Sequence, residues 1–143
     1  MNANAELLNF VYENSQMGVK SLRQILDMLD DEEFKKYLEK QLNGYEGFHE
    51  QAKEMLKKNG FDEKGLNAFE KVRTYLMINM QTLTDKSASH IAEMLIIGSS
   101  MGVIDAIKNV KKYKNSAEKD ILELMEHLKR FEEKNMEKLK EYL

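Results

Sequence analysis

Apolar residues recur every three or four positions along most of the chain, which is the spacing that lines one face of an α-helix. In the amino-terminal half this spacing predicts a helix over residues 4–29 and a second over residues 32–58. Asp30 and Asp31 stop the first helix and cap the second, and Gly60 provides a left-handed carboxyl-terminal cap. Because the turn between them is tight, the two helices should pack antiparallel.

The remainder of the chain repeats this organisation. The spacing predicts helices over residues 66–84, 88–113 and 117–142, with Ser87 or Ser89 as the cap of the second of these. The helix over 66–84 is the shortest and is suited to a crossover that runs back along the bundle. The helix over 88–113 carries apolar residues on every side, so other helices must cover it. We therefore expect residues 1–143 to form one all-α domain.

The composition agrees with a helical fold and excludes several chemistries. Proline is absent and charged residues make up 33% of the chain, which favours helix nearly everywhere. Without cysteine, the chain has no disulfide, no thiolate metal ligand and no thiol nucleophile. The ten methionines are scattered over the predicted helices, which is more typical of adaptable core side chains than of a copper site.

Charge and hydropathy bear on partners and location. The 22 basic and 25 acidic side chains are interspersed and give a net charge of -3, so we expect no nucleic acid partner. We find no secretory signal and no run of about 18 uninterrupted apolar residues, which predicts a cytoplasmic protein without a membrane partner. The apolar helix over 88–113 favours a homo-oligomer, most simply a dimer.

Two short segments in the predicted long helices have nearly the same sequence. Residues 15–19 read Ser-Gln-Met-Gly-Val and residues 99–103 read Ser-Ser-Met-Gly-Val, and each lies in the first half of a long helix. This internal similarity indicates two related helical hairpins. Small residues let helix backbones approach closely, so we expect close interhelical packing at Ser15, Gly18, Ser99 and Gly102.

Two hairpins joined by a long connection are typical of ferritin-like proteins. The chain resembles an uncharacterised bacterial family of ferritin-like proteins, and its most distinctive stretch runs from Leu76 through His90 to Met94. The resemblance implies an up-down four-helix bundle of two hairpins plus one crossover helix, and it brings no assigned activity. A five-helix up-and-down bundle is the alternative.

A ferritin-like bundle invites a search for a carboxylate-bridged metal pair, which needs two Glu and two Glu-x-x-His motifs on four helices. Glu46 and His49 form one such motif, whereas the corresponding positions of the last helix are Glu132 and Asn135. Glu13 completes the candidate set of Glu46, His49, Glu13 and Glu132, which would hold iron or manganese. The alternative for His49 is a structural histidine hydrogen-bonded to a neighbour such as Asn135.

No Ser-His-Asp arrangement and no glycine-rich phosphate loop is recognisable in the sequence. The leading interpretation is a non-catalytic ferritin-like bundle that acts through self-association or partner binding. One alternative is a divergent metal-binding protein, either an oxidoreductase or a metal store, that uses Glu46 and His49 with Glu13, Glu93, Glu126 or Glu132. Another is a module that binds a small apolar ligand or a partner helix between methionine-lined helices.

Overall fold

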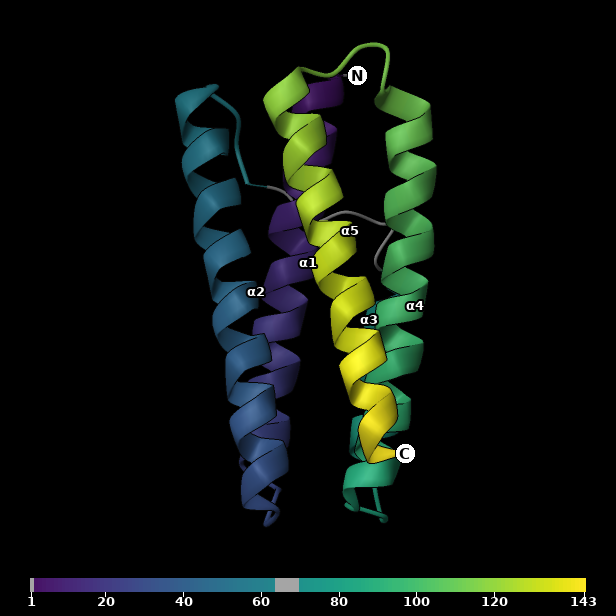
Figure 1. The fold of residues 1–143 in the computed structure, drawn as a ribbon. Coiled ribbons are helices and arrows are strands. Elements are labelled where there is room, and N and C mark those ends of the chain that lie inside the picture. Colours follow the sequence, from purple (N-terminus) through teal and green to yellow (C-terminus); the bar gives the residue numbers. More distant parts are fainter. Residues whose placement is uncertain (1, 64–69) are drawn as a thin grey trace.

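The computed structural model describes residues 2–63 and 70–143, and every regular element in those residues is a helix (Figure 1). The all-α prediction is therefore confirmed, with five α-helices in the described parts of the chain. Their bounds, followed by those of a terminal 3-10 turn, are α1 Ala3–Leu26, α2 Glu32–Lys58, α3 Glu70–Gln81, α4 Ala88–Tyr113, α5 Lys119–Leu139 and η2 Lys140–Tyr142.

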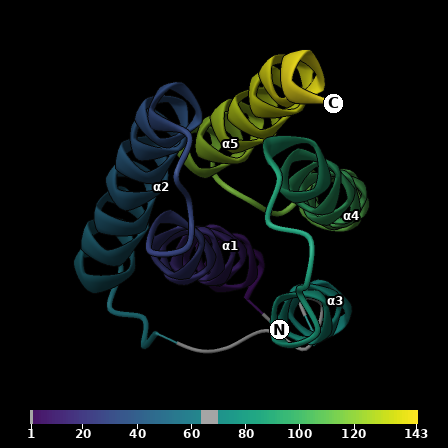
Figure 2. The same ribbon diagram turned by 90° about the horizontal axis from the view of Figure 1, so that it is seen from below.

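Successive helices run in alternating directions along the bundle, as Figure 1 shows. The helices α1 and α2 form one hairpin and α4 and α5 form the other, and α1 also contacts α4 and α5. Seen along the bundle axis in Figure 2, the shorter α3 lies beside α1 and α4, away from α2 and α5. Its helical contacts are mainly with α4. The connection between the two hairpins thus returns along one side of the bundle.

The predicted helix boundaries at three turns are confirmed by their capping contacts. The carboxylate of Asp31 accepts a hydrogen bond from the backbone N–H of Phe34 at 3.1 Å, which begins α2. Gly60 has a φ of 74°, the left-handed conformation that closes a helix. Of the two serines proposed for the start of α4, Ser87 is the cap, and its hydroxyl accepts from the N–H of His90.

Four predicted boundaries were wrong by a few residues. The first helix ends at Leu26, not at residue 29, because the N–H of Met28 bonds to the Ile25 carbonyl and tightens the last turn. The third ends at Gln81, before residue 84, where the Thr82 hydroxyl bonds back to a main-chain carbonyl. Its predicted start at residue 66 lies outside the described residues.

The fifth helix begins at Lys119, two residues later than predicted, because the preceding turn extends to Ala117, whose N–H bonds to the Tyr113 carbonyl. It ends at Leu139 and is followed by the 3-10 turn instead of continuing to residue 142. At its start, the side chain of Asn4 accepts a hydrogen bond from the Glu118 N–H at 2.8 Å, which ties α5 to the beginning of α1.

The core consists of apolar side chains from all five helices. The largest fully buried side chains come from both hairpins and are Phe10, Phe34, Leu7, Leu8, Leu22, Ile25, Leu38, Leu56, Ile91, Met94 and Ile121. Among the described helices, α4 alone has the length and apolar content of a membrane span, although less than half of its most apolar stretch is buried. A single helix of this kind is weak evidence for a membrane.

Candidate functional site

One carboxyl group lies in the middle of the bundle. Glu132 of α5 is only 4% exposed, and it is the one charged residue among the buried residues of the described chain. Burial raises the pKa of Glu132 to about 7, although hydrogen bonds from Tyr45 and Ser99 act in the opposite direction. The group therefore lies near the balance between its neutral and ionised forms at neutral pH.

The partners of Glu132 come from the two other helices that face it. The hydroxyl of Tyr45 on α2 donates a hydrogen bond to Glu132 Oε1, and Ser99 on α4 also bonds to the carboxyl group. Gln41, one turn before Tyr45, bonds to the tyrosine hydroxyl, and burial raises the pKa of Tyr45 far above its ordinary value. The result is a connected polar network in an otherwise apolar core.

Glycines of the two similar segments make room for this network. A Cβ atom at Gly18 would stand 2.6 Å from the ring of Tyr45, so only glycine lets the tyrosine ring lie against α1. A Cβ atom at Gly102 would stand 3.2 Å from Asn14 Oδ1 and 3.7 Å from Glu132 Oε2. Two of the small residues that were predicted for close packing, Gly18 and Gly102, thus lie beside the buried polar groups.

A cavity of about 30 Å³ adjoins the network, which is room for one or two water-sized groups. Its polar lining comes from four helices, and its apolar lining includes Leu22, Val72 and Leu95. Gln41 is 2% exposed, and its Oε1 atom has no hydrogen-bond partner. The polar residues around the cavity are Asn14, Ser21, Gln41, Tyr45, Ser99 and Glu132.

A much larger groove of about 730 Å³ lies between α1 and α3. At one end an ion pair joins Arg73 to Glu13 at 3.3 Å. The groove and the central cavity share three lining residues, so they are neighbours separated by side chains. The groove residues are Glu13, Gln16, Met17, Lys20, Ser21, Gln24, Met28, Arg73, Leu76, Met77, Met80 and Gln81, and the shared ones are Met17, Ser21 and Leu76.

Each candidate metal ligand is engaged with a different partner. Glu46 faces Arg23 at 3.5 Å, and its side chain is 44% exposed. Glu13 pairs with Arg73, and Glu132 lies in the central network. In the described residues no three side chains of His, Asp or Glu are grouped to hold a metal ion. Binding of iron or manganese by this set stays a prediction.

His49, the fourth candidate, packs against α1. Its ring lies 4.6 Å from the ring of Tyr12, and its Nδ1 atom is 3.5 Å from the Ser15 hydroxyl. The suggested partner Asn135 is elsewhere, because its side-chain oxygen accepts a hydrogen bond from Tyr37 at 3.1 Å. The geometry agrees with the structural interpretation of His49 and corrects the identity of its neighbour.

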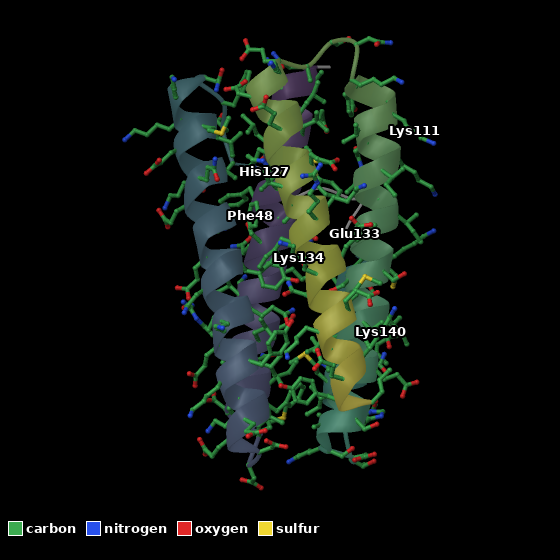
Figure 3. The ribbon with its side chains drawn as sticks, in the orientation of Figure 1. Phe48, Lys111, His127, Glu133, Lys134 and Lys140 are labelled. Atoms are coloured by element: carbon green, nitrogen blue, oxygen red, sulfur yellow. The ribbon has the colours of Figure 1, made fainter. Side chains whose placement is uncertain are left out.

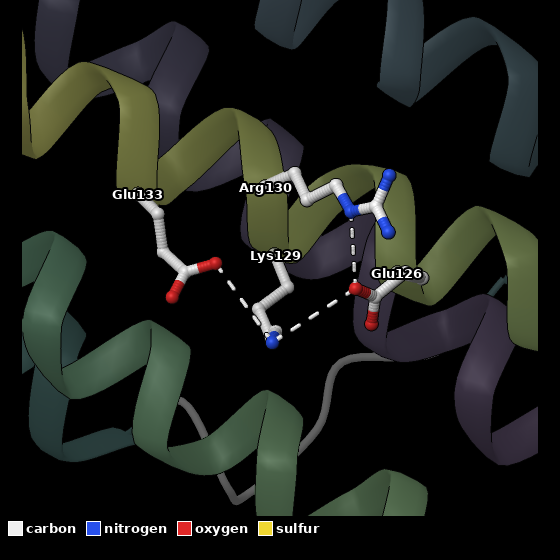
Figure 4. A network of polar contacts seen from close by, with 4 residues as sticks. All are labelled: Glu126, Lys129, Arg130 and Glu133. Atoms are coloured by element: carbon white, nitrogen blue, oxygen red, sulfur yellow. Dashed lines mark hydrogen bonds and ion pairs between the residues drawn. The ribbon is translucent and has the colours of Figure 1, made fainter.

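The exposed face of α5 carries ionic residues of both signs. His127 lies on this helix, as labelled in Figure 3, and is exposed. Figure 4 shows Lys129 between Glu126 and Glu133, with nitrogen-to-oxygen distances of 3.9 and 3.8 Å. Arg130 also contacts Glu126, at 3.1 Å. The carboxylate of Glu126, a candidate to complete a metal site, is therefore already paired with two cations.

Comparison with known protein families, with curated proteins and with solved structures finds no match for this chain.

Proposed function

We propose that this protein is a binding bundle that holds a small amphiphilic molecule in the groove between α1 and α3, and that it acts by binding, not by catalysis. The observation that carries the proposal is the groove itself, whose volume of about 730 Å³ falls in the range typical of small-molecule sites. Four methionines line it, and methionine side chains adapt to ligands of irregular shape.

The lining also fits a ligand with both apolar and polar parts. Met17, Met28, Met77 and Met80 give an apolar surface, while glutamine and charged side chains stand among them. Met77 is 50% exposed, so a ligand that covers it removes apolar surface from water. This gain is available because the described part of α3 buries only Val72 and Leu76.

Titration calorimetry with straight-chain alcohols of increasing length tests the proposal. We expect the affinity to rise about fourfold per methylene group until the groove is filled, since each buried methylene contributes about 0.8 kcal/mol. Met77→Lys should weaken binding at least about tenfold. Ile78→Lys is the matched control, because Ile78 is 53% exposed on the same helix but does not line the groove. Equal losses in the two variants would contradict the proposal, and so would an affinity that does not rise with chain length.

Self-association is a second candidate, and it rests on the outer face of α4. Ile97, Ile104 and Ile107 are each more than a third exposed and lie along one side of this helix. Glu93 lies near the beginning of α4 and Lys108 near its end, and both are exposed. In a two-fold antiparallel contact between two copies, the acidic end of each α4 faces the basic end of the other.

Sedimentation velocity at micromolar concentration tests this contact. We expect a dimer for the unmodified chain and a monomer for Ile104→Glu, which places a charge in the apolar contact. Ile78→Glu is the control, since Ile78 is as exposed as Ile104 but lies on α3. A monomer for the unmodified chain would contradict this candidate, and so would a dimer that survives Ile104→Glu.

We also propose the ferritin-like relationship. Its support is the resemblance in sequence together with the order of the helices, two antiparallel hairpins joined by a shorter connecting helix. An experimental structure of the full chain tests the fold. It should show α1, α2, α4 and α5 around one core, with the connection along a single side.

A further inference from the structure

The surroundings of the central cavity are rich in hydrogen-bond acceptors. Gln41 Oε1 is buried and has no donor. Asn14 and Glu132 also line the cavity, and their Oδ1 and Oε2 atoms both lie within 4 Å of the point where a Cβ atom at Gly102 would stand. The tyrosine proton nearby is already committed, since the Tyr45 hydroxyl donates to Glu132 Oε1. A group that completes this site must therefore donate hydrogen bonds.

The charge in the centre points to a cationic donor. A buried carboxylate is stable only when a proton, a metal ion or another cation compensates it. No lysine, arginine or histidine is among the buried residues of the described chain, so no basic side chain of that part does so. The site has a single carboxylate, and a monovalent cation matches its charge better than a divalent ion.

The size and surroundings of the cavity narrow the choice further. At about 30 Å³ it admits an ammonium group but not the much larger head of a quaternary amine. Its other walls include Met17 and Leu76, which also line the groove, so an aliphatic chain attached to the cation would leave in that direction. A primary ammonium has three N–H groups for oxygen acceptors and one bond left for such a chain.

We infer that the ligand of the groove is an aliphatic primary amine, whose ammonium group enters the central cavity beside Glu132 and Gln41 while its chain lies among the methionines between α1 and α3. This inference rests on the proposed function and adds the chemical class of the ligand. Met17 and Leu76 line both the cavity and the groove, so rotation of these two side chains would give the head group its way into the cavity.

Calorimetry at pH 8 with octylamine, octanol and octyltrimethylammonium tests the inference, since a primary amine with a pKa near that of lysine is protonated there. We expect octylamine to bind at least about tenfold more tightly than octanol, because its hydrogen bonds are charge-assisted. Octyltrimethylammonium should bind no more tightly than octanol, because its head group is too large for the cavity. In Glu132→Gln, which keeps the shape of the side chain, the ratio of the octylamine affinity to the octanol affinity should fall towards one.

Glu13 supplies the rival explanation, because its carboxylate lines the groove itself. If Glu13 caused the preference for the amine, Glu13→Gln would remove the preference and Glu132→Gln would not. That result would overturn the inference. Gln41→Leu removes one acceptor without changing the charge, and it should reduce the preference severalfold. Unfolding curves of each variant establish that it is folded.

The failures of the two proposals are distinguishable. If octanol binds in the groove but octylamine binds no better, the inference about the amine is wrong and the proposed function stands. The same conclusion follows if the trimethylammonium compound binds as tightly as octylamine. If none of the three compounds binds, both proposals fail.

Discussion

The helices α2 and α5 both contain an aromatic residue followed by glutamate, and they place this pair in opposite ways. On α2 the aromatic residue Tyr45 is buried and Glu46 lies at the surface beside Arg23. On α5 the glutamate, Glu132, is buried, and the aromatic residue Phe131 is only partly covered. Adjacent residues on a helix point about 100° apart, so a small rotation about the helix axis decides which of the two enters the core.

Glycines on neighbouring helices account for both placements. Gly18 of α1 leaves room for the ring of Tyr45, and Gly44 of α2 leaves room for the ring of Phe131. The two rings also contact each other edge to face, with their centres 5.0 Å apart. The contrast teaches that the identity of the residue opposite, more than the local motif, selects the side chain that reaches the centre.

The largest expected consequence is a dependence of stability on pH. The folded state raises the pKa of Glu132 from 4.5 to about 7, so between these values the folded protein binds more protons than the unfolded chain. Stability is therefore highest below pH 4.5 for this group and falls as the pH rises to 7, by about 3 kcal/mol. The only titratable side chain bonded to this carboxyl is Tyr45, which stays neutral in this range.

Urea unfolding of the unmodified protein and of Glu132→Gln from pH 4 to pH 8 measures this effect. The difference between the two free energies of unfolding isolates Glu132 from other groups, such as Asp105, whose pKa is also raised by burial. Glu46→Gln should keep the dependence of the unmodified protein, because Glu46 is at the surface. A difference that does not change with pH would show that Glu132 is not buried as described.

The sequence predicted the helices well because their ends depend on local chemistry. Asp31, Gly60 and Ser87 act within a few residues of their own position, so their effects are readable without the tertiary structure. The centre was harder to predict. After Leu128, the apolar stripe of the last helix continues equally well at Phe131 or at Glu132, three or four positions later.

A clue to the polar centre was nevertheless present in the sequence. Gln41 and Asn135 occupy positions of the apolar stripes of their helices, where a polar side chain is unexpected, and both are buried. No local sequence pattern predicts the pairing of Tyr45 with Glu132, because this pairing depends on how two helices are rotated relative to each other. The bond between their side chains joins residues far apart in the chain.

The second prediction concerns Gly18 and Gly44, the glycines that make room for the rings of Tyr45 and Phe131. Gly18→Ala should cost about 2 kcal/mol, since its methyl group meets the base of the buried Tyr45 ring. Gly44→Ala should cost less, about 1 kcal/mol, because its methyl group meets the outer edge of the Phe131 ring, which is only partly buried. Gly47→Ala is the matched control on α2, where a Cβ atom meets nothing within 4 Å.

Urea unfolding at one pH ranks the three variants. The control should gain up to about 1 kcal/mol, since alanine favours the helix over glycine. An equal cost for Gly18→Ala and Gly47→Ala would mean that the Tyr45 ring does not lie against α1, and the explanation of the contrast would be lost.

The smallest effect on stability is expected for Glu46, the exposed glutamate of the two. Glu46→Gln breaks the ion pair between Glu46 and Arg23, whose side chains are 44% and 64% exposed, and should change stability by less than about 0.5 kcal/mol.

If Glu46 and His49 instead bind iron or manganese, Glu46→Gln and His49→Ala should each lower the metal content. From the separate partners of these residues we expect less than about a tenth of an equivalent of either metal before and after substitution, measured by elemental analysis after loading. If the unmodified protein instead binds a stoichiometric amount of metal and both variants lose it, then Glu46 and His49 form a metal site outside the centre of the bundle.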